Sequence, residues 1–176
     1  MRRSDLDPWA EALDTFPLTG EPAARLAAVV RFAVLAPSSH NSQPWLFRVE
    51  GDRLELWADR TRALAVSDPE DRELTISCGC ALLNLKIALR SFGQKISSQL
   101  LPDAAQPDLL ARVRLEGDQE AGPDDRELYH AIPKRRTNRQ PFESRGVPEG
   151  MLARARKAAE VEGAWLQTLD GESDRI

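Results

Sequence analysis

The segment from Pro69 to Phe92 constrains the fold most, because it predicts a long helix whose middle, Ile76 to Leu89, is apolar or small on nearly every face. Asp68 precedes it as a candidate N-cap, and Gly93 follows it as a residue suited to ending a helix. A helix that is apolar all round belongs in the centre of a fold. The rest of the chain must therefore supply elements that cover this segment.

The other expected elements alternate between helices and strands. Apolar residues at helical spacing, or a proline in the first turn, predict helices at 22–36, 124–132 and 148–161. Alternating apolar and polar residues predict a β-hairpin at 44–58, with further strands at 95–101, 109–115 and 165–169. Trp9, Leu13 and Phe16 are expected to dock an irregular N-terminal arm on the fold.

Composition and charge exclude several classes of protein. The chain has 176 residues, 41% hydrophobic and 30% charged, which fits a soluble globular protein of ordinary domain size. No apolar run approaches the roughly 20 residues that cross a bilayer. Met1–Asp5 is not followed by the apolar stretch of a secretory signal, and the net charge of −4 argues against a nucleic-acid partner. We therefore expect a cytoplasmic protein.

The two cysteines, Cys78 and Cys80, lie two residues apart within the predicted central helix. Their side chains therefore point in different directions. This geometry suits neither a mutual disulfide nor a shared metal ion. We expect two buried, reduced thiols and no metal site.

A dense polar loop, Pro37–Trp45, lies between the first predicted helix and the hairpin. Its central side chains are Ser38, Ser39, His40, Asn41, Ser42 and Gln43. Neutral, directional groups of this kind can match the donors and acceptors along the edge of a planar ligand. From these residues alone, an ordinary Ser/Asn turn after a helix is an equally good interpretation.

The loop resembles the flavin loop of the nitroreductase family, whose pattern is Pro-Ser-Ser-x-Asn-x-Gln-Pro-Trp, with every specified position present. The resemblance implies an α+β fold, with a central antiparallel or mixed sheet around a long buried helix, and FMN as cofactor. It implies that FMN is contacted by Ser38, Ser39, Asn41 and Gln43. It places His40, the candidate catalytic position, at the substrate pocket.

A basic segment lies further along the chain, where Arg135–Arg139 contains three guanidinium groups and a hydroxyl. Guanidinium groups bind a phosphomonoester through paired hydrogen bonds, and a hydroxyl adds another donor. Taken alone, a solvated basic turn after Pro133 is the favoured interpretation of this segment.

The basic segment is similar to the Arg-Arg-Ser-x-Arg segment with which nitroreductases grip the FMN phosphate, with Thr in place of Ser. The resemblance implies phosphate contacts from Arg135, Arg136, Thr137 and Arg139. In nitroreductases this segment precedes the Ser-Ser loop, whereas here it follows about a hundred residues later. That order is similar to the duplicated Acg-like relatives, in which two halves of one chain replace two subunits. We therefore expect residues 1–120 to form a first half and residues 121–176 to begin a second, leaving the fold incomplete.

The resemblance predicts an oxidoreductase that takes electrons from NAD(P)H and reduces an electron-poor acceptor of the nitroaromatic or quinone type. Two alternatives remain open. One is a non-catalytic protein that binds or stores FMN, as in the Acg-like relatives. The other is a truncated pseudo-enzyme that acts as a dimerisation module, in which the central helix pairs with a second copy in a homodimer.

Overall fold

The computed structural model describes residues 16, 17, 19–143 and 145–169. The chain divides into two compact units, Met1–Thr137 and Asn138–Ile176. The predictions for Trp9, Leu13 and Met1–Asp5 lie outside the described residues.

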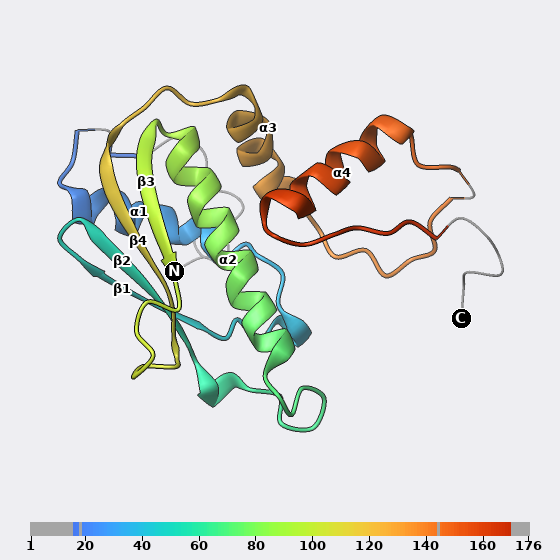
Figure 1. Cartoon of the computed structure of the whole chain (residues 1–176), viewed down its shortest axis with the longest axis horizontal. Coiled ribbons are helices and arrows are strands. Elements are labelled where there is room, and N and C mark those ends of the chain that lie inside the picture. Colours follow the sequence, from blue (N-terminus) through green and yellow to red (C-terminus); the bar gives the residue numbers. More distant parts are fainter. Residues whose placement is uncertain (1–15, 18, 144, 170–176) are drawn as a thin grey trace, which may run out of the picture. The chain divides into compact units, whose positions relative to one another are not determined.

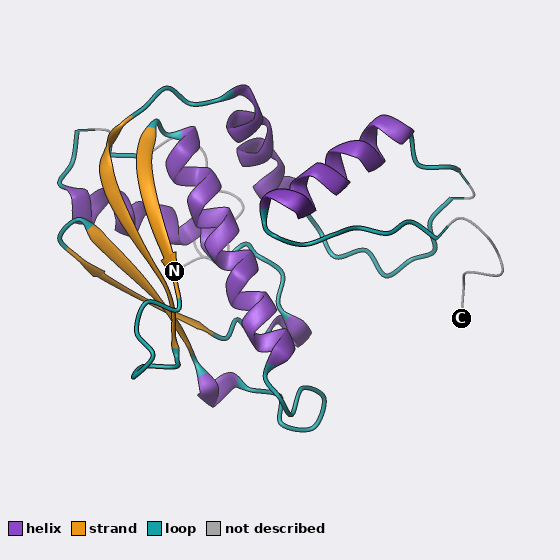
Figure 2. Ribbon diagram, viewed as in Figure 1, coloured by secondary structure: helices purple, strands orange, loops and turns teal. Residues whose placement is uncertain are grey.

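The first unit is an α+β fold built on a four-stranded antiparallel sheet of order β1-β2-β4-β3 (Figures 1 and 2). Its strands are β1 (Trp45–Glu50), β2 (Arg53–Ala58), β3 (Gln94–Leu100) and β4 (Leu109–Asp118). Its helices are α1 (Pro22–Ala33), α2 (Arg72–Ser91) and α3 (Pro123–Ala131). Short 3₁₀ turns occur at η2 (Ser39–Asn41), η3 (Arg60–Arg62) and η4 (Ile132–Lys134). The predicted hairpin and the strands predicted at 95–101 and 109–115 are confirmed.

One face of the sheet forms the core together with α1 and α2. In the strand register, Phe47 lies opposite Leu56, and Leu56 lies opposite Ala111. Since side chains alternate between faces along a strand, these positions point to the same side. That side shares a single hydrophobic cluster with helix residues such as Val29 and Leu85, both fully buried. The helices therefore hold the sheet on one face, next to the polar loop that joins α1 to β1.

Helix α2 begins later than predicted, at Arg72, after Asp71 adopts a left-handed conformation (φ 53°). The N-cap is therefore Asp71, not Asp68 as predicted. The Asp68 carboxylate nevertheless accepts the Leu74 N–H at 2.9 Å and so satisfies one donor of the first turn. Backbone hydrogen bonds, which outweigh the opposing effect of desolvation, keep the pKa of Asp68 below its ordinary value. At the other end, Gly93 adopts φ +73° and closes the helix as predicted.

By length and composition, α2 could also cross a membrane, with a mean hydropathy of 1.2 over its most apolar window. Half of that window is buried inside the protein. This burial is typical of the core helix of a soluble fold. The remaining side of α2 exposes Ile76 (50%) and Leu83 (39%) among the described residues.

Aromatic side chains close the end of the core near the C-terminus of α2. Phe16 stacks on Phe92 with ring centroids 4.2 Å apart, and Tyr129 of α3 meets Phe32 and Phe92 edge-on. Phe16 thus docks on the fold as predicted. These contacts attach α3 to α2 within the first unit.

The second unit contains α4 (Glu149–Val161) and extended segments on both sides of it. Among its described residues, none is buried. The strand predicted at 165–169 is wrong, since residues 164–169 have no regular structure. A strand needs a hydrogen-bonded neighbour, and the described part of this unit contains no other strand.

Candidate functional site

The polar loop has an unusual backbone. His40, Asn41 and Gln43 have φ of 52°, 56° and 50°, in the left-handed region. Such conformations are uncommon for residues other than glycine, and they persist only when surrounding contacts hold them. Three in four consecutive positions indicate a loop whose shape is imposed by its environment.

Hydrogen bonds within the loop hold part of this shape. Ser38 Oγ accepts the Gln43 N–H at 3.0 Å, which ties the two ends of the turn together. The Asn41 and Ser42 N–H groups donate to the carbonyls of Ser38 and Ser39, each at 3.0 Å. These bonds occupy the backbone of η2 and leave the side chain of Asn41 at the surface.

Residues after β2 hold the loop from one side. Arg62 Nη1 donates to the carbonyls of Ser42 (3.3 Å) and Gln43 (3.4 Å). Its guanidinium is itself paired with Asp59 at 3.1 Å, and the Asp59 N–H donates to the Pro44 carbonyl at 3.0 Å. The positive charge therefore lies against carbonyls of the strained turn, including that of Gln43.

Helix α2 holds the loop from the other side. The Cys78 thiol donates to the Pro44 carbonyl at 3.2 Å, and Ser39 Oγ donates to Glu73 Oε2 at 2.5 Å. Burial raises the pKa of Cys78 to about 12, so the thiol keeps its proton and remains a donor at neutral pH. Cys78 is buried, as predicted, whereas Cys80 is half-buried; both are free.

The predicted ligand-binding side chains of the loop lie together around η2. Ser38, Ser39 and Gln43 are half-buried, while His40 and Asn41 are exposed. Gln43 Nε2 contacts Asn41 Oδ1 at 3.4 Å. The loop therefore presents a cluster of neutral donors and acceptors at the surface of the first unit.

Arg135 is brought to the base of the same loop. Its Nη2 donates to the carbonyl of Leu35 at 3.2 Å, across 100 residues of sequence. Leu35 lies three positions before Ser38, where α1 gives way to the loop. The Arg135 Nε is buried and has no hydrogen-bond partner among the described residues. This guanidinium thus retains an unused donor close to the loop.

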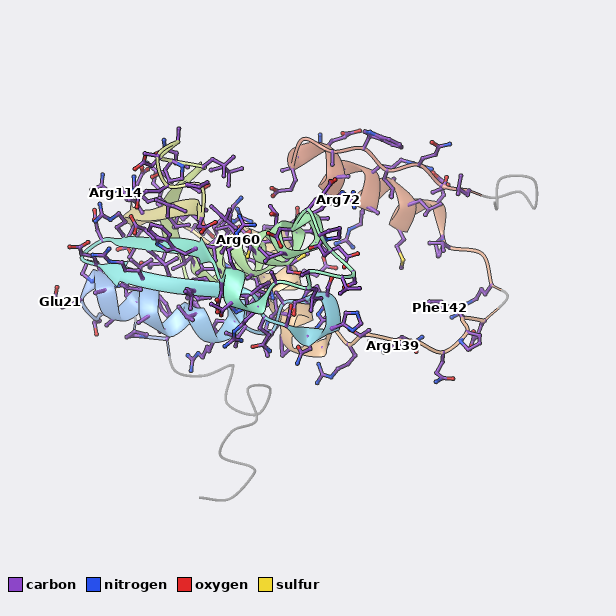
Figure 3. All side chains as sticks on the ribbon, turned by 90° about the horizontal axis from the view of Figure 1, so that it is seen from below. Glu21, Arg60, Arg72, Arg114, Arg139 and Phe142 are labelled. Atoms are coloured by element: carbon purple, nitrogen blue, oxygen red, sulfur yellow. The ribbon has the colours of Figure 1, made fainter. Side chains whose placement is uncertain are left out.

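The other members of the basic segment are placed differently. Arg136 Nη1 donates to the carbonyls of Pro133 (2.6 Å) and Arg135 (2.8 Å), so it folds back on its own backbone. Thr137 is exposed at the end of the first unit, and Arg139 belongs to the second unit. Figure 3 shows Arg139 and Phe142 on the extended segment that precedes α4. Of the four residues predicted to bind phosphate, Arg135 is the one whose described contact lies next to the loop, at Leu35.

Sequence reasoning missed the residues that hold the loop, namely Asp59, Arg62, Glu73 and Cys78 in these roles. Each lies outside the loop motif, and no local pattern distinguishes Arg62 or Glu73 from other surface charges. Asp59 gave one local signal, because its carboxylate accepts the Thr61 N–H at 3.1 Å and so starts η3.

Comparison with known proteins extends these observations. No protein-family model matches the chain. It is 39% identical over 141 residues to a Mycobacterium tuberculosis protein named "Putative NAD(P)H nitroreductase Rv3131", a match that covers 79% of this chain and 40% of that protein. It is 32% identical over 117 residues to "Putative NAD(P)H nitroreductase acg" of the same organism, covering 66% of this chain and 35% of that protein.

A third relative from M. tuberculosis, the uncharacterized protein Rv3127, is 35% identical over 123 residues, covering 68% of this chain and 36% of that protein. The chain thus spans well under half the length of the curated relatives that it matches. The printed names of two of these relatives agree with the resemblance to nitroreductases. The chain belongs to the nitroreductase-like family that includes the Acg-like relatives.

Proposed function

We propose that this chain forms part of an FMN site in an oxidoreductase that uses NAD(P)H to reduce an electron-poor acceptor of the nitroaromatic or quinone type. The observation that carries the proposal is the loop at η2. Three left-handed residues are held there by hydrogen bonds from α2, from the segment after β2 and from the loop itself. Strain that is stabilised in this way is typical of functional sites.

The residues present fit FMN chemically. Ser38, Ser39, Asn41 and Gln43 offer neutral donors and acceptors of the kind that a flavin ring edge and ribityl chain require. Arg135 supplies a guanidinium with a buried donor that no described group satisfies, as a phosphate site would need. Bound FMN would supply hydride transfer, while the protein orients the flavin and tunes its potential.

We assign the following roles to the chain's own groups as part of this proposal. The loop side chains would orient the flavin, and Arg62 and Cys78 would keep the loop backbone in the binding conformation. Arg135, with Arg136, Thr137 and Arg139, would bind the phosphate, and His40 would face the substrate. We further propose that residues 121–176 correspond to the start of a second half, which contributes the phosphate-binding segment.

The test is an absorption spectrum of the purified protein followed by a titration with FMN, observed through quenching of flavin fluorescence. We expect the visible absorption bands of a flavin. We also expect FMN to bind at least about tenfold more weakly in Arg135→Ala combined with Arg139→Ala, because two charge-assisted contacts are lost. Arg126→Ala, which removes an exposed arginine from α3, is the matched control. A protein that neither contains flavin nor binds added FMN would refute the proposal.

A second candidate is a non-catalytic FMN-binding or storage protein of the Acg-like type. It rests on the same loop, in which the half-buried Ser38, Ser39 and Gln43 would hold FMN whether or not the flavin turns over. Oxidation of NAD(P)H in the presence of a nitroaromatic or quinone, at a rate that depends on FMN, would refute this alternative.

The third candidate, a dimerisation module, is supported by the uncovered side of α2. Ile76 and Leu83 are exposed there, and a side-chain carbon at Gly79 would meet no atom within 4 Å. In a homodimer, a second copy would cover this side. Sedimentation of the protein as a monomer at micromolar concentration would contradict the dimerisation module.

A further inference from the structure

Ser38 and Ser39 are adjacent and chemically alike, yet the structure gives their hydroxyl groups opposite hydrogen-bonding character. Ser38 Oγ accepts the Gln43 N–H at 3.0 Å, so its own proton remains available to a ligand. Ser39 Oγ donates its proton to Glu73 Oε2 at 2.5 Å, so only its lone pairs remain available. One serine therefore offers a donor, and the next offers only an acceptor.

We propose that Glu73 is a positioning residue that fixes Ser39 as a hydrogen-bond acceptor and thereby selects ligands that present a donor at this point. The inference rests on the proposed flavin site and deepens it. An ionised carboxylate has no proton to give, so it accepts from Ser39 and cannot act as the donor in this contact. Glu73 lies outside the loop motif, on a different element.

The position of Glu73 is fixed by the start of α2. Its neighbour Leu74 donates its N–H to the buried carboxylate of Asp68 at 2.9 Å. The Glu73 carbonyl accepts from Ser77 Oγ at 2.7 Å, one turn further along the helix. The carboxylate is therefore presented to Ser39 from an anchored backbone.

A flavin has donors that suit such a partner, namely the ring imide N–H and the hydroxyl groups of the ribityl chain. If Ser39 were free to rotate, it could equally serve a ligand acceptor, and the site would discriminate less. Ser39 is half-buried and Glu73 is exposed, so the pair lies at the surface of the first unit. An analogue that lacks the matching donor leaves the Ser39 lone pairs without a partner and so binds less tightly.

The experiment measures the dissociation constants of FMN and riboflavin for four forms of the full chain: wild type, Glu73→Gln, Ser39→Ala and the double variant. Glutamine can donate to Ser39 Oγ and so removes the fixed polarity at nearly constant size. We expect Glu73→Gln to weaken both ligands by about twofold to tenfold, the worth of one net hydrogen bond. In the Ser39→Ala background, the same change should have no further effect.

Riboflavin and Glu70→Gln control for charge. Riboflavin lacks the phosphate, so an effect of Glu73 that acts through phosphate repulsion would appear with FMN alone. Glu70 is an exposed acid just before α2, and Glu70→Gln makes the same change of charge without touching Ser39. Melting temperatures of the ligand-free variants report any general loss of stability.

Three results would overturn the inference while leaving the FMN site intact. The first is unchanged flavin affinity in Glu73→Gln. The others are a loss of affinity as large as that of Glu73→Gln alone, either when Glu73→Gln is added to Ser39→Ala or in Glu70→Gln. Failure of the wild type to bind either flavin would overturn the proposed function and this inference together. The wild-type titration therefore separates the two.

Discussion

The two compact units differ in how they are stabilised. In the first unit, residues such as Phe32, Leu54 and Leu85 are fully buried in one cluster that joins the helices to the sheet. In the second, no described residue is buried, and Phe142 and Trp165 are 84% and 80% exposed. Burial of apolar surface is the dominant favourable term in folding. The first unit therefore has its own core, whereas the helix of the second depends on local interactions or on a surface that covers it.

Hydrogen exchange is expected to show the largest contrast. Amides in the buried part of α2, around Leu85, should open only with global unfolding, which costs about 5 kcal/mol or more. Amides in α4, around Ala155, should be protected by less than about tenfold, because an isolated helix of this length is marginal in water. Mass spectrometry of exchanged peptides measures both. Strong protection of α4 would instead show that another surface buries it in solution.

The next contrast concerns two phenylalanines. Phe32→Ala removes a fully buried ring packed against Phe92 and Tyr129, and should lower the free energy of unfolding by about 3–5 kcal/mol. Phe142→Ala removes an exposed ring and should change it by less than about 0.5 kcal/mol. Urea denaturation followed by tryptophan fluorescence provides both values. Similar losses in the two variants would contradict the difference between the units.

Two glycines that follow helices give a smaller, matched contrast. Gly93 and Gly163 have φ of +73° and +75° after α2 and α4. Gly93→Ala adds left-handed strain and places a carbon 3.0 Å from the Gln119 carbonyl oxygen. It should therefore lower the free energy of unfolding by about 2 kcal/mol. Gly163→Ala meets no atom within 4 Å, and its strain falls on a helix that contributes little to global stability. Thermal melting should therefore shift only for Gly93→Ala, and an equal shift for both would show that α4 unfolds together with the first unit.

The smallest effect concerns Cys78 and depends on pH. Burial raises the pKa of this thiol from 9.0 to about 12. Above pH 9 the unfolded chain releases the thiol proton while the folded protein keeps it, so stability is lost as pH rises towards 12. Cys78→Ala should cost about 1 kcal/mol at pH 7, through the lost contact with Pro44 and a small void. Denaturation curves at pH 7 and pH 10 give the free energy of unfolding of both proteins. The difference between wild type and variant should be smaller at pH 10 than at pH 7, and a larger difference at pH 10 would contradict this account.

Much of the first unit follows from local sequence. The hairpin at 45–58 obeys the alternation of its side chains and turns at Gly51, whose φ of 58° suits glycine. The end of α2 at Gly93 follows from residue preferences at helix ends. Helix α3 begins at Pro123, one residue before the predicted start. The strand predicted at 165–169 failed because an apolar stretch forms a strand only beside a partner, which the described part of the second unit lacks.

In the candidate site too, some residues could be predicted from local sequence and others could not. The loop motif is a local pattern, so Ser38, Ser39, Asn41 and Gln43 could be selected from the sequence. The groups that hold the loop could not, because Arg62 and Glu73 reach it from 19 and 34 residues away. Such contacts depend on how the helices and the sheet pack, and no spacing rule predicts them.

The sequence by itself therefore determined the types and order of most elements and the chemical groups of the polar loop, because these depend on near neighbours in the chain. Only the tertiary structure decided that Arg135 contacts Leu35, just before the loop, across 100 residues. The tertiary structure also decided that Glu73 gives Ser39 the opposite hydrogen-bonding role from Ser38. The physical reason is that the direction of a hydroxyl proton is set by the acceptor that lies within reach. That acceptor is brought there by the packing of α2 beside the loop.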